Sequence, residues 1–243
     1  MNLSFNEKNQ IADNSQLELL RKDFPTINQE INKYPLVYLD SAASSQMPQQ
    51  VIDEISRYQS QDHSNVHRGI HTLSHRATEV YETSRQNICE FINAKNTNEI
   101  IFTSGTTDSI NLVANSYCKP KLDPSKKILI SHLEHHSNIV PWQLICEQTG
   151  ASLIVAPIDN NGEIITEQLI DMIDSNVVLV AISHISNALG SVTSLNKIID
   201  AAHQHEVPVL VDGAQAISHM KIDIQALNAD FYAFSGHKML GPT

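Results

Sequence analysis

The stretch VPVLVDGAQ, residues 207–215, decides the fold class of this chain. Its apolar run is short and nearly continuous, which is typical of a strand buried on both faces of a sheet. The run ends at Asp212, where a carboxylate is costly to bury unless it has a partner. The sequence therefore predicts a buried strand with a functional group at its carboxyl end. A helix-capping role for Asp212 is the structural alternative.

Further apolar runs lie on both sides of this stretch, and helical segments separate most of them. The strand-like runs span residues 100–103, 127–131, 152–156, 177–183 and 231–234. The helical segments span residues 110–117, 139–148, 167–173 and 195–205. Strands that alternate with helices form βαβ units, so the predicted fold class is α/β with a mostly parallel sheet and flanking helices.

The first hundred residues predict helices and loops rather than this regular alternation. We expect a helix through Leu17, Leu19 and Leu20 that ends before Phe24-Pro25, forming an N-terminal arm over residues 1–25. The remaining residues, 26–243, are expected to form one large domain. The first segments of that domain are predicted as a short strand at 37–39, a turn at 40–44, a helix after Pro48, a polar loop at 60–69 and a helix at 74–92.

The composition excludes several classes of function. The formal net charge is −11, so the chain offers no broad basic surface for nucleic acid. The polar N-terminus lacks the apolar core of a signal peptide, and the longest apolar run, 177–182, is too short to span a bilayer. We therefore expect a cytoplasmic protein without nucleic-acid or membrane partners. Cys89, Cys118 and Cys146 show no paired spacing, which favours reduced structural thiols.

Polar residues follow the predicted strands, at the edge of an open α/β sheet where ligands bind. After residues 100–103 come Ser104, Gly105, Thr106 and Thr107, which open a helix. The free N–H groups of a helix start, a glycine and two hydroxyls favour a phosphate ligand. An ordinary capped helix is the alternative.

A histidine-rich segment, SHLEHH at residues 131–136, follows the next strand. A histidine in this place could stack on a flat aromatic ligand. The segment also contains possible metal ligands, but its spacing fits neither of the zinc motifs HExxH and HxxEH. Solvated loop histidines are the third possibility.

The stretch FYAFSGHK, residues 231–238, places Lys238 just after an apolar strand. Desolvation disfavours the charged form of an amine, and an uncharged amine can form a Schiff base at neutral pH. Ser235 and His237 add hydrogen-bond donors that suit a phosphate. A protonated pyridine nitrogen would be a suitable partner for Asp212. A structural ion pair is the alternative for Lys238.

The residues at these strand ends belong to a series of motifs that follow one another along the chain. The motifs are YLDSAAS at 38–44, VHRGIHTLS at 66–74, GTT at 105–107, EHHSNIVPW at 134–142, SNALG at 186–190, VDGAQA at 211–216 and FSGHK at 234–238. From about residue 17 onward, the sequence closely resembles the class V aminotransferase family. Within it, the resemblance is to cysteine desulfurases of the sulfur-mobilising iron–sulfur assembly type and to the related selenocysteine lyases.

The resemblance implies a fold-type I domain that binds pyridoxal 5′-phosphate (PLP) in a homodimer. Lys238 would hold the cofactor as a Schiff base and shuttle protons, and His135 would stack on the ring and assist proton transfer. Asp212 would pair with the pyridine nitrogen, and Gln215 would bond the ring hydroxyl. The other implied contacts are to the phosphate from Thr106, Thr107, Ser235 and His237, and to the substrate from Ala42, Ala43, Asn187 and His67.

The implied reaction converts L-cysteine to L-alanine and leaves the sulfur as a persulfide for an acceptor protein in iron–sulfur cluster assembly. Selenocysteine lyase, acting on L-selenocysteine, is the alternative activity. The sequence ends five residues after Lys238, whereas relatives continue into a small C-terminal domain. We therefore expect the catalytic cysteine and the carboxylate-binding arginine to be absent, and none of the three cysteines is assigned as the nucleophile.

This chain alone is therefore expected to be poorly stable or inactive, with an unpaired sheet edge and exposed apolar surface after Phe234. An inactive PLP-binding or dimerisation module is the non-enzymatic alternative. A metalloprotein built on the histidines is the weakest alternative.

Overall fold

A computed structural model describes residues 14–242 of the chain. Its centre is a five-stranded sheet in which every neighbouring pair of strands is parallel, with the order β4-β3-β5-β6-β7. The strands are β3 (Lys127–Ser131), β4 (Ser152–Ala156), β5 (Val177–Ser183), β6 (Val209–Asp212) and β7 (Phe231–Ala233). The predicted α/β class with a parallel sheet is confirmed.

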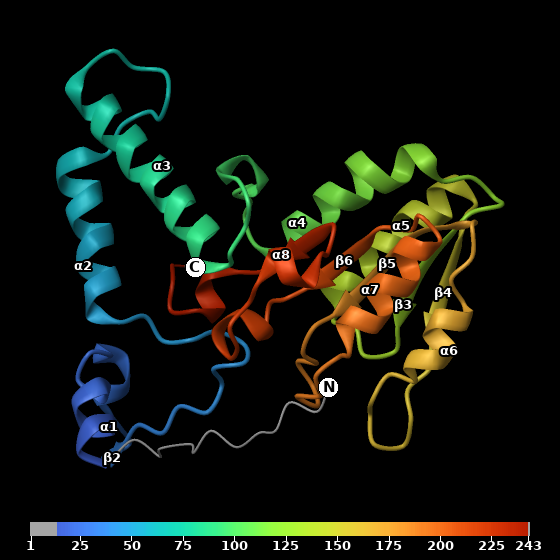
Figure 1. Cartoon of the computed structure of the whole chain (residues 1–243). Helices are drawn as coiled ribbons and strands as arrows, with labels where there is room; N and C mark the ends of the chain where they lie inside the picture. Colours follow the sequence, from blue (N-terminus) through green and yellow to red (C-terminus); the bar gives the residue numbers. More distant parts are fainter. Residues whose placement is uncertain (1–13, 243) are drawn as a thin grey trace.

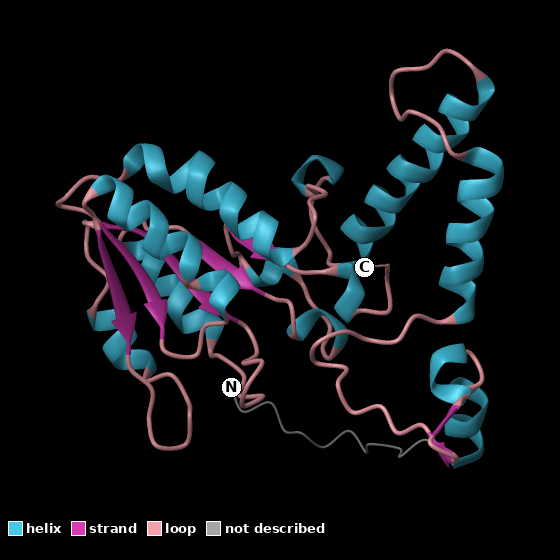
Figure 2. Ribbon diagram, turned by 180° about the vertical axis from the view of Figure 1, so that it is seen from behind, coloured by secondary structure: helices cyan, strands magenta, loops and turns pink. Residues whose placement is uncertain are grey.

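Helices cover both faces of this sheet (Figures 1 and 2). Helices α4 (Thr106–Val113) and α5 (Val140–Thr149) pack on one face, and α6 (Thr166–Asp171) and α7 (Leu195–Gln204) pack on the other. Neighbouring residues of β3 point to opposite sides, so Ile128 packs with α4 and α5 while Leu129 packs with α7. The strands are therefore buried on both faces, as their apolar runs predict.

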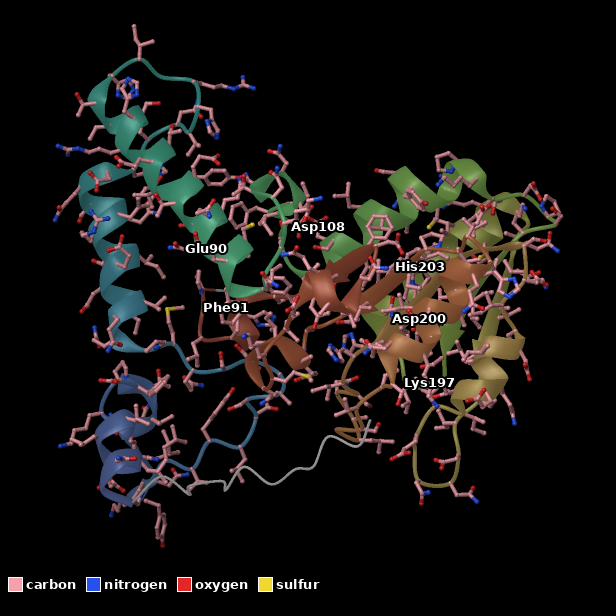
Figure 3. The ribbon with its side chains drawn as sticks, viewed as in Figure 1. Glu90, Phe91, Asp108, Lys197, Asp200 and His203 are labelled. Carbon is pink, nitrogen blue, oxygen red and sulfur yellow. The ribbon has the colours of Figure 1, made fainter. Side chains whose placement is uncertain are left out.

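Helix α7 shows how the sequence pattern produces this packing. Leu195, Ile198, Ile199 and Ala202 recur at helical spacing and are buried against the sheet. Figure 3 labels the polar residues Lys197, Asp200 and His203 along the same helix, and the first two are exposed. A short helix, α8 (Ile224–Leu227), precedes β7 and ends at Asn228 in the left-handed conformation.

The N-terminal part of the structure stands beside this core (Figure 1). It contains α1 (Asn14–Arg21), α2 (Gln49–Arg57) and α3 (Thr72–Phe91), so the three predicted helices are confirmed. Helix α2 has no buried residue, and α3 buries only Ser74, Ala77 and Cys89. The proposed division between an arm at 1–25 and a domain at 26–243 stays a prediction, and residues 1–13 lie outside the described chain. No helix between residues 14 and 242 has both the length and the apolar composition that crossing a bilayer requires.

Two predicted strands are absent from the structure, and the reason is the same for both. Residues 37–39 and 100–103 belong to no helix or strand and pair with no strand of the described chain. A short antiparallel hairpin of β1 (Glu30–Ile31) and β2 (Tyr34–Pro35) forms just before the first of them. A strand needs a neighbour for its N–H and C=O groups, and an apolar pattern alone does not provide one. Leu39 is accordingly 89% exposed, and Ile101 is 64% exposed.

The outer edge of β7 has the predicted character of an unpaired edge. Within residues 14–242, β7 pairs with β6 alone. A groove of about 850 Å³ runs beside it, and Ile101, Leu112 and Phe231 are among the residues that line it. The exposed apolar surface expected at this edge is therefore present.

Candidate functional site

A cavity of about 510 Å³ lies at the carboxyl ends of β5 and β6, beside the loop that follows β7. Every residue predicted for the site lines this cavity except His67. The lining residues among those predicted are Ala42, Ala43, Thr106, Thr107, His135, Asn187, Asp212, Gln215, Ser235, His237 and Lys238. The chain thus brings together residues that are up to 196 positions apart, from Ala42 to Lys238.

Asp212 is the buried acid of the cavity. It ends β6 opposite Ser183 of β5 and is only 5% exposed. Its Oδ1 accepts a hydrogen bond from the Ala214 N–H at 3.0 Å, and no other donor in the described chain reaches the carboxylate. Burial raises the pKa of Asp212, while the Ala214 N–H and the charges of Lys238 and His135 lower it. Such a carboxylate would be stabilised by a cationic partner in the cavity.

Tyr232 of the neighbouring strand β7 packs beside Gly213, the residue after Asp212. A side chain on Gly213 would meet the Tyr232 ring at 2.1 Å, so a larger residue there would force the ring to move. The hydroxyl of Tyr232 lies 3.0 Å from Nδ1 of His184. Burial and the charge of Asp212 raise the pKa of Tyr232, which keeps this hydroxyl protonated.

A cluster of hydroxyl groups surrounds the N-terminus of α4. Gly105 precedes the helix with φ of 125°, a backbone conformation that favours glycine. The Ser235 Oγ accepts the Thr106 N–H at 2.8 Å and lies 2.7 Å from the Thr106 hydroxyl. The Thr107 hydroxyl lies 2.8 Å from that of Ser137. Hydroxyl groups and helix N–H groups at one place are suited to binding a phosphate.

Lys238 is half-buried in the turn Gly236–Lys238 that follows β7. The Ser45 N–H and the Ser45 hydroxyl both donate to the His237 carbonyl at 2.9 Å, which fixes this turn against the N-terminal part. None of the ion pairs formed by residues 14–242 includes Lys238. The alternative of a structural ion pair is therefore not observed in the described chain.

His135 lies in the loop between β3 and α5. Its Nδ1 accepts a hydrogen bond from the Ser137 N–H at 3.1 Å, and the Ser137 hydroxyl lies 2.9 Å from the same atom. Because Nδ1 accepts the Ser137 N–H, Nε2 is the ring nitrogen that carries the proton when His135 is neutral. Within residues 14–242, no three histidine, cysteine or acidic side chains converge as a metal site would require.

The predicted substrate-binding residues differ in their placement. Ala42 and Ala43 line the cavity, and the Gln215 side chain donates to the Ala42 carbonyl at 2.8 Å, so it holds the 40–44 turn in place. Asn187 lines the cavity from an exposed loop after β5. His67 does not line it: its Nε2 lies 2.9 Å from Glu82 on α3. The substrate role of His67 stays a prediction.

The structure adds cavity residues to which the sequence analysis gave no role, among them Ser137, Ser183 and Asp40. Ser183 is the last residue of β5 and faces Asp212 in the register. Its position at a strand end was a usable signal, because the same rule identified Asp212. Ser137 had no such signal, since its contact with Thr107 depends on the tertiary fold.

The three cysteines are buried and unpaired, as predicted. Burial raises the pKa of Cys118 to about 12 and that of Cys146 to about 11. Both thiols therefore stay protonated at neutral pH, and none of the three cysteines lines the cavity.

Three known proteins illustrate what this chain is similar to. A cysteine desulfurase from Escherichia coli O7:K1 is 49% identical over 227 residues, which are 93% of this chain and 56% of that protein. The apo structure of cysteine desulfurase from Thermococcus onnurineus NA1 superposes with a TM-score of 0.86 at 37% identity, covering 93% of this chain and 55% of that one. A structure described as SspA in complex with cysteine superposes with a TM-score of 0.79 at 28% identity, covering 86% of this chain and 59% of that one.

The chain thus spans little more than half the length of each of these three proteins. The two superposed structures agree with a parallel sheet and flanking helices. The family model described as "Aminotransferase class-V" matches residues 37–243. That match includes every element that lines the cavity, so the chain belongs to the class-V aminotransferase family.

Proposed function

We propose that this chain is the cofactor-binding part of a PLP-dependent cysteine desulfurase, with Lys238 as the residue that bonds the cofactor. The observation that carries the proposal is the convergence of a buried acid, an amine without an ion-pair partner among residues 14–242, an imidazole and a hydroxyl cluster on one cavity. The cysteine desulfurase relative at 49% identity supports the choice of activity within the family.

The residues of the cavity fit PLP on their own chemistry. The cofactor has an anionic phosphate, a protonated ring nitrogen and an aldehyde, and the cavity offers a partner for each. The hydroxyls of Thr106, Thr107 and Ser235 would hold the phosphate, together with the His237 side chain. The free carboxylate oxygen of Asp212 would pair with the ring nitrogen, and the amine of Lys238 would bond the aldehyde.

Bound PLP would supply an electron-withdrawing ring that stabilises negative charge on the α-carbon of an amino-acid substrate. The chain's own residues would then control geometry and protons. Lys238 would take and return a proton at its Nζ. His135 would lie against the cofactor ring with its orientation fixed by Ser137. Gln215 uses its amide N–H on the Ala42 carbonyl, which leaves its Oε1 to accept from a ring hydroxyl.

The substrate, product and partners are part of the same proposal. We infer that a protein thiolate attacks the sulfur of L-cysteine, so that the carbon–sulfur bond breaks, L-alanine is released and the sulfur stays on that thiol as a persulfide. The outer persulfide sulfur would then pass to an acceptor protein in iron–sulfur cluster assembly. The similar structure of SspA in complex with cysteine supports cysteine as the substrate. A homodimer in the cytoplasm is proposed on the resemblance and on the composition.

Borohydride reduction tests the cofactor and its attachment. The purified chain is incubated with PLP, reduced, digested and mapped by mass spectrometry. We expect a pyridoxyl group on Lys238, and none on Lys238→Ala. A folded protein that takes up no PLP, or that carries the group only on other lysines, would contradict the proposal. L-Alanine released from L-cysteine and from L-selenocysteine by the intact gene product then separates desulfurase from selenocysteine lyase.

A further inference from the structure

Glu134 is a buried carboxylate to which the proposed chemistry gives no task. It is 7% exposed and precedes His135, the imidazole that lines the cavity. Its Oε1 accepts from the Ser131 hydroxyl at 2.5 Å, and its Oε2 accepts from the Asn138 amide and from the Ser183 hydroxyl, both at 2.6 Å. Three hydrogen-bond donors thus satisfy one buried carboxylate, which shows that the fold specifically accommodates this side chain.

The three donors come from three different elements. Ser131 is the last residue of β3, Ser183 is the last residue of β5, and Asn138 ends the turn that leads into α5. Asn138 is held in its turn, because its Oδ1 accepts from Nε1 of Trp142, which is fully buried. Glu134 therefore connects the carboxyl ends of two central strands to the start of the helix that follows.

These connections enclose the loop 132–138 that carries His135. Inside the loop, the Asn138 N–H donates to the His135 carbonyl at 2.7 Å, and the Leu133 N–H donates to the Ser131 hydroxyl at 3.1 Å. The same residues that bond the Glu134 carboxylate thus also shape the backbone on both sides of His135. A change at Glu134 would release both ends of the loop together.

We propose that Glu134 is a positioning residue that holds His135 against the cavity by joining the ends of β3 and β5 to Asn138. This inference rests on the proposed function, because it assigns to His135 the task of lying against the cofactor ring. Burial raises the pKa of Glu134 to about 7, while the Ser131, Ser183 and Asn138 donors lower it. All three donors are neutral, so the site restrains a loop without the charge balance of an ion pair.

The chemistry of the site distinguishes a positioning role from a requirement for charge. Glutamine has the same shape and can accept from Asn138 through Oε1. Its amide nitrogen can donate to a serine hydroxyl, which is able to reverse its own donor role. Glu134→Gln should therefore keep the loop in place, whereas Glu134→Ala leaves the Asn138 amide and two hydroxyls without their partner.

The test compares cofactor binding and cofactor orientation in the purified chain loaded with PLP. Visible circular dichroism of the bound cofactor reports how asymmetrically the protein holds the ring. We expect Glu134→Ala to lose most of this signal and to bind PLP about tenfold more weakly. Glu134→Gln should restore the signal. Ser131→Ala is a second, milder variant for the case that Glu134→Ala does not fold. It removes one of the three donors without altering a cavity residue, and it should lose a smaller part of the circular dichroism signal.

A control separates positioning from general stability. Ile198→Ala creates a cavity in the core on the far side of the sheet and is expected to destabilise the fold without changing the visible signal. If the signal falls in Ile198→Ala as much as in Glu134→Ala at equal stability, or stays intact in Glu134→Ala, the positioning role is overturned. If the unaltered chain binds no PLP on Lys238, the proposed function fails, which is a different result.

Discussion

Strand β5 and the segment at residues 37–39 have similarly apolar sequences but different structures. β5 is paired on both sides, with β3 and β6, and all its residues except Val178 are buried. Residues 37–39 pair with nothing in the described chain, and Leu39 stands 89% exposed. The difference shows that an apolar run becomes a strand where neighbours supply hydrogen bonds and a covering helix.

The largest expected effect tests this comparison with one residue type. Leu179 is fully buried in β5, so Leu179→Ala is expected to lower the free energy of unfolding by about 2 to 5 kcal/mol through lost contacts and a cavity. Leu39→Ala, at an exposed position, is expected to change it by less than about 0.5 kcal/mol. Urea unfolding of both variants measures the difference. Equal losses would mean that residues 37–39 are packed in the folded chain.

The second prediction uses the pH dependence of stability to separate Glu134, at the end of the sheet, from Asp62, in the N-terminal part. Burial raises the folded pKa of Glu134 from 4.5 to about 7, so its protonated form favours folding. This contribution is fully present below pH 4.5 and is lost as the pH rises through about 7, and its full size is about 3 kcal/mol. Glu134→Gln should remove this pH dependence.

For Asp62, in the N-terminal part, the contribution to stability changes with pH in the opposite direction. The guanidinium of Arg57 lowers the pKa of Asp62, with a smaller effect from Arg76. The stabilisation from Asp62 is therefore present at neutral pH and is lost as the pH falls through its lowered pKa. Asp62→Asn should flatten the acid side of the stability curve, while Glu134→Gln flattens the side between pH 4.5 and about 7. If both variants changed the stability curve in the same pH range, Glu134 and Asp62 could not be the separate causes of the two pH dependences.

The smallest predicted effect concerns the contact between β6 and β7. A methyl group on Gly213 would collide with the Tyr232 ring, so Gly213→Ala is expected to cost about 1 to 3 kcal/mol and to disturb Asp212. Gly236→Ala is the control, because its added methyl group would meet its nearest atom at 3.6 Å. Thermal unfolding and PLP affinity measure the two effects. A neutral Gly213→Ala would show that the Tyr232 ring moves freely away from residue 213.

Local patterns predicted the sheet and the cavity residues that follow the apolar runs, whereas Ala42, Ala43 and Asn187 were expected only from the family resemblance. Asp212 ends β6 and Lys238 follows β7 closely, and the parallel topology brings such strand ends together. Thr106 also lines the cavity, but it follows residues 100–103, which are not a strand of this sheet. The absent strands at 37–39 and 100–103 could not be recognised this way, since their partners are a property of the whole fold.

The contacts between side chains could not be predicted from local sequence patterns either. Glu134 counted only as a possible metal ligand beside its histidines, yet the fold buries it under three neutral donors. The bond from Gln215 to the Ala42 carbonyl crosses 173 positions, and no spacing within one segment predicts it. His67 belongs to a quoted motif, but its place beside Glu82 depends on how α3 begins.

The bond between the Ser45 hydroxyl and the His237 carbonyl has a consequence for folding kinetics. It joins residues 192 positions apart, so the turn that carries Lys238 is fixed by one of the most distant contacts in the chain. Contacts of high sequence separation form late, because the entropy of closing a long loop must be overcome first. We therefore expect the lysine turn to reach its final place after the sheet has assembled. A refolding experiment followed by both tryptophan fluorescence and cofactor absorbance would then show the fluorescence change first.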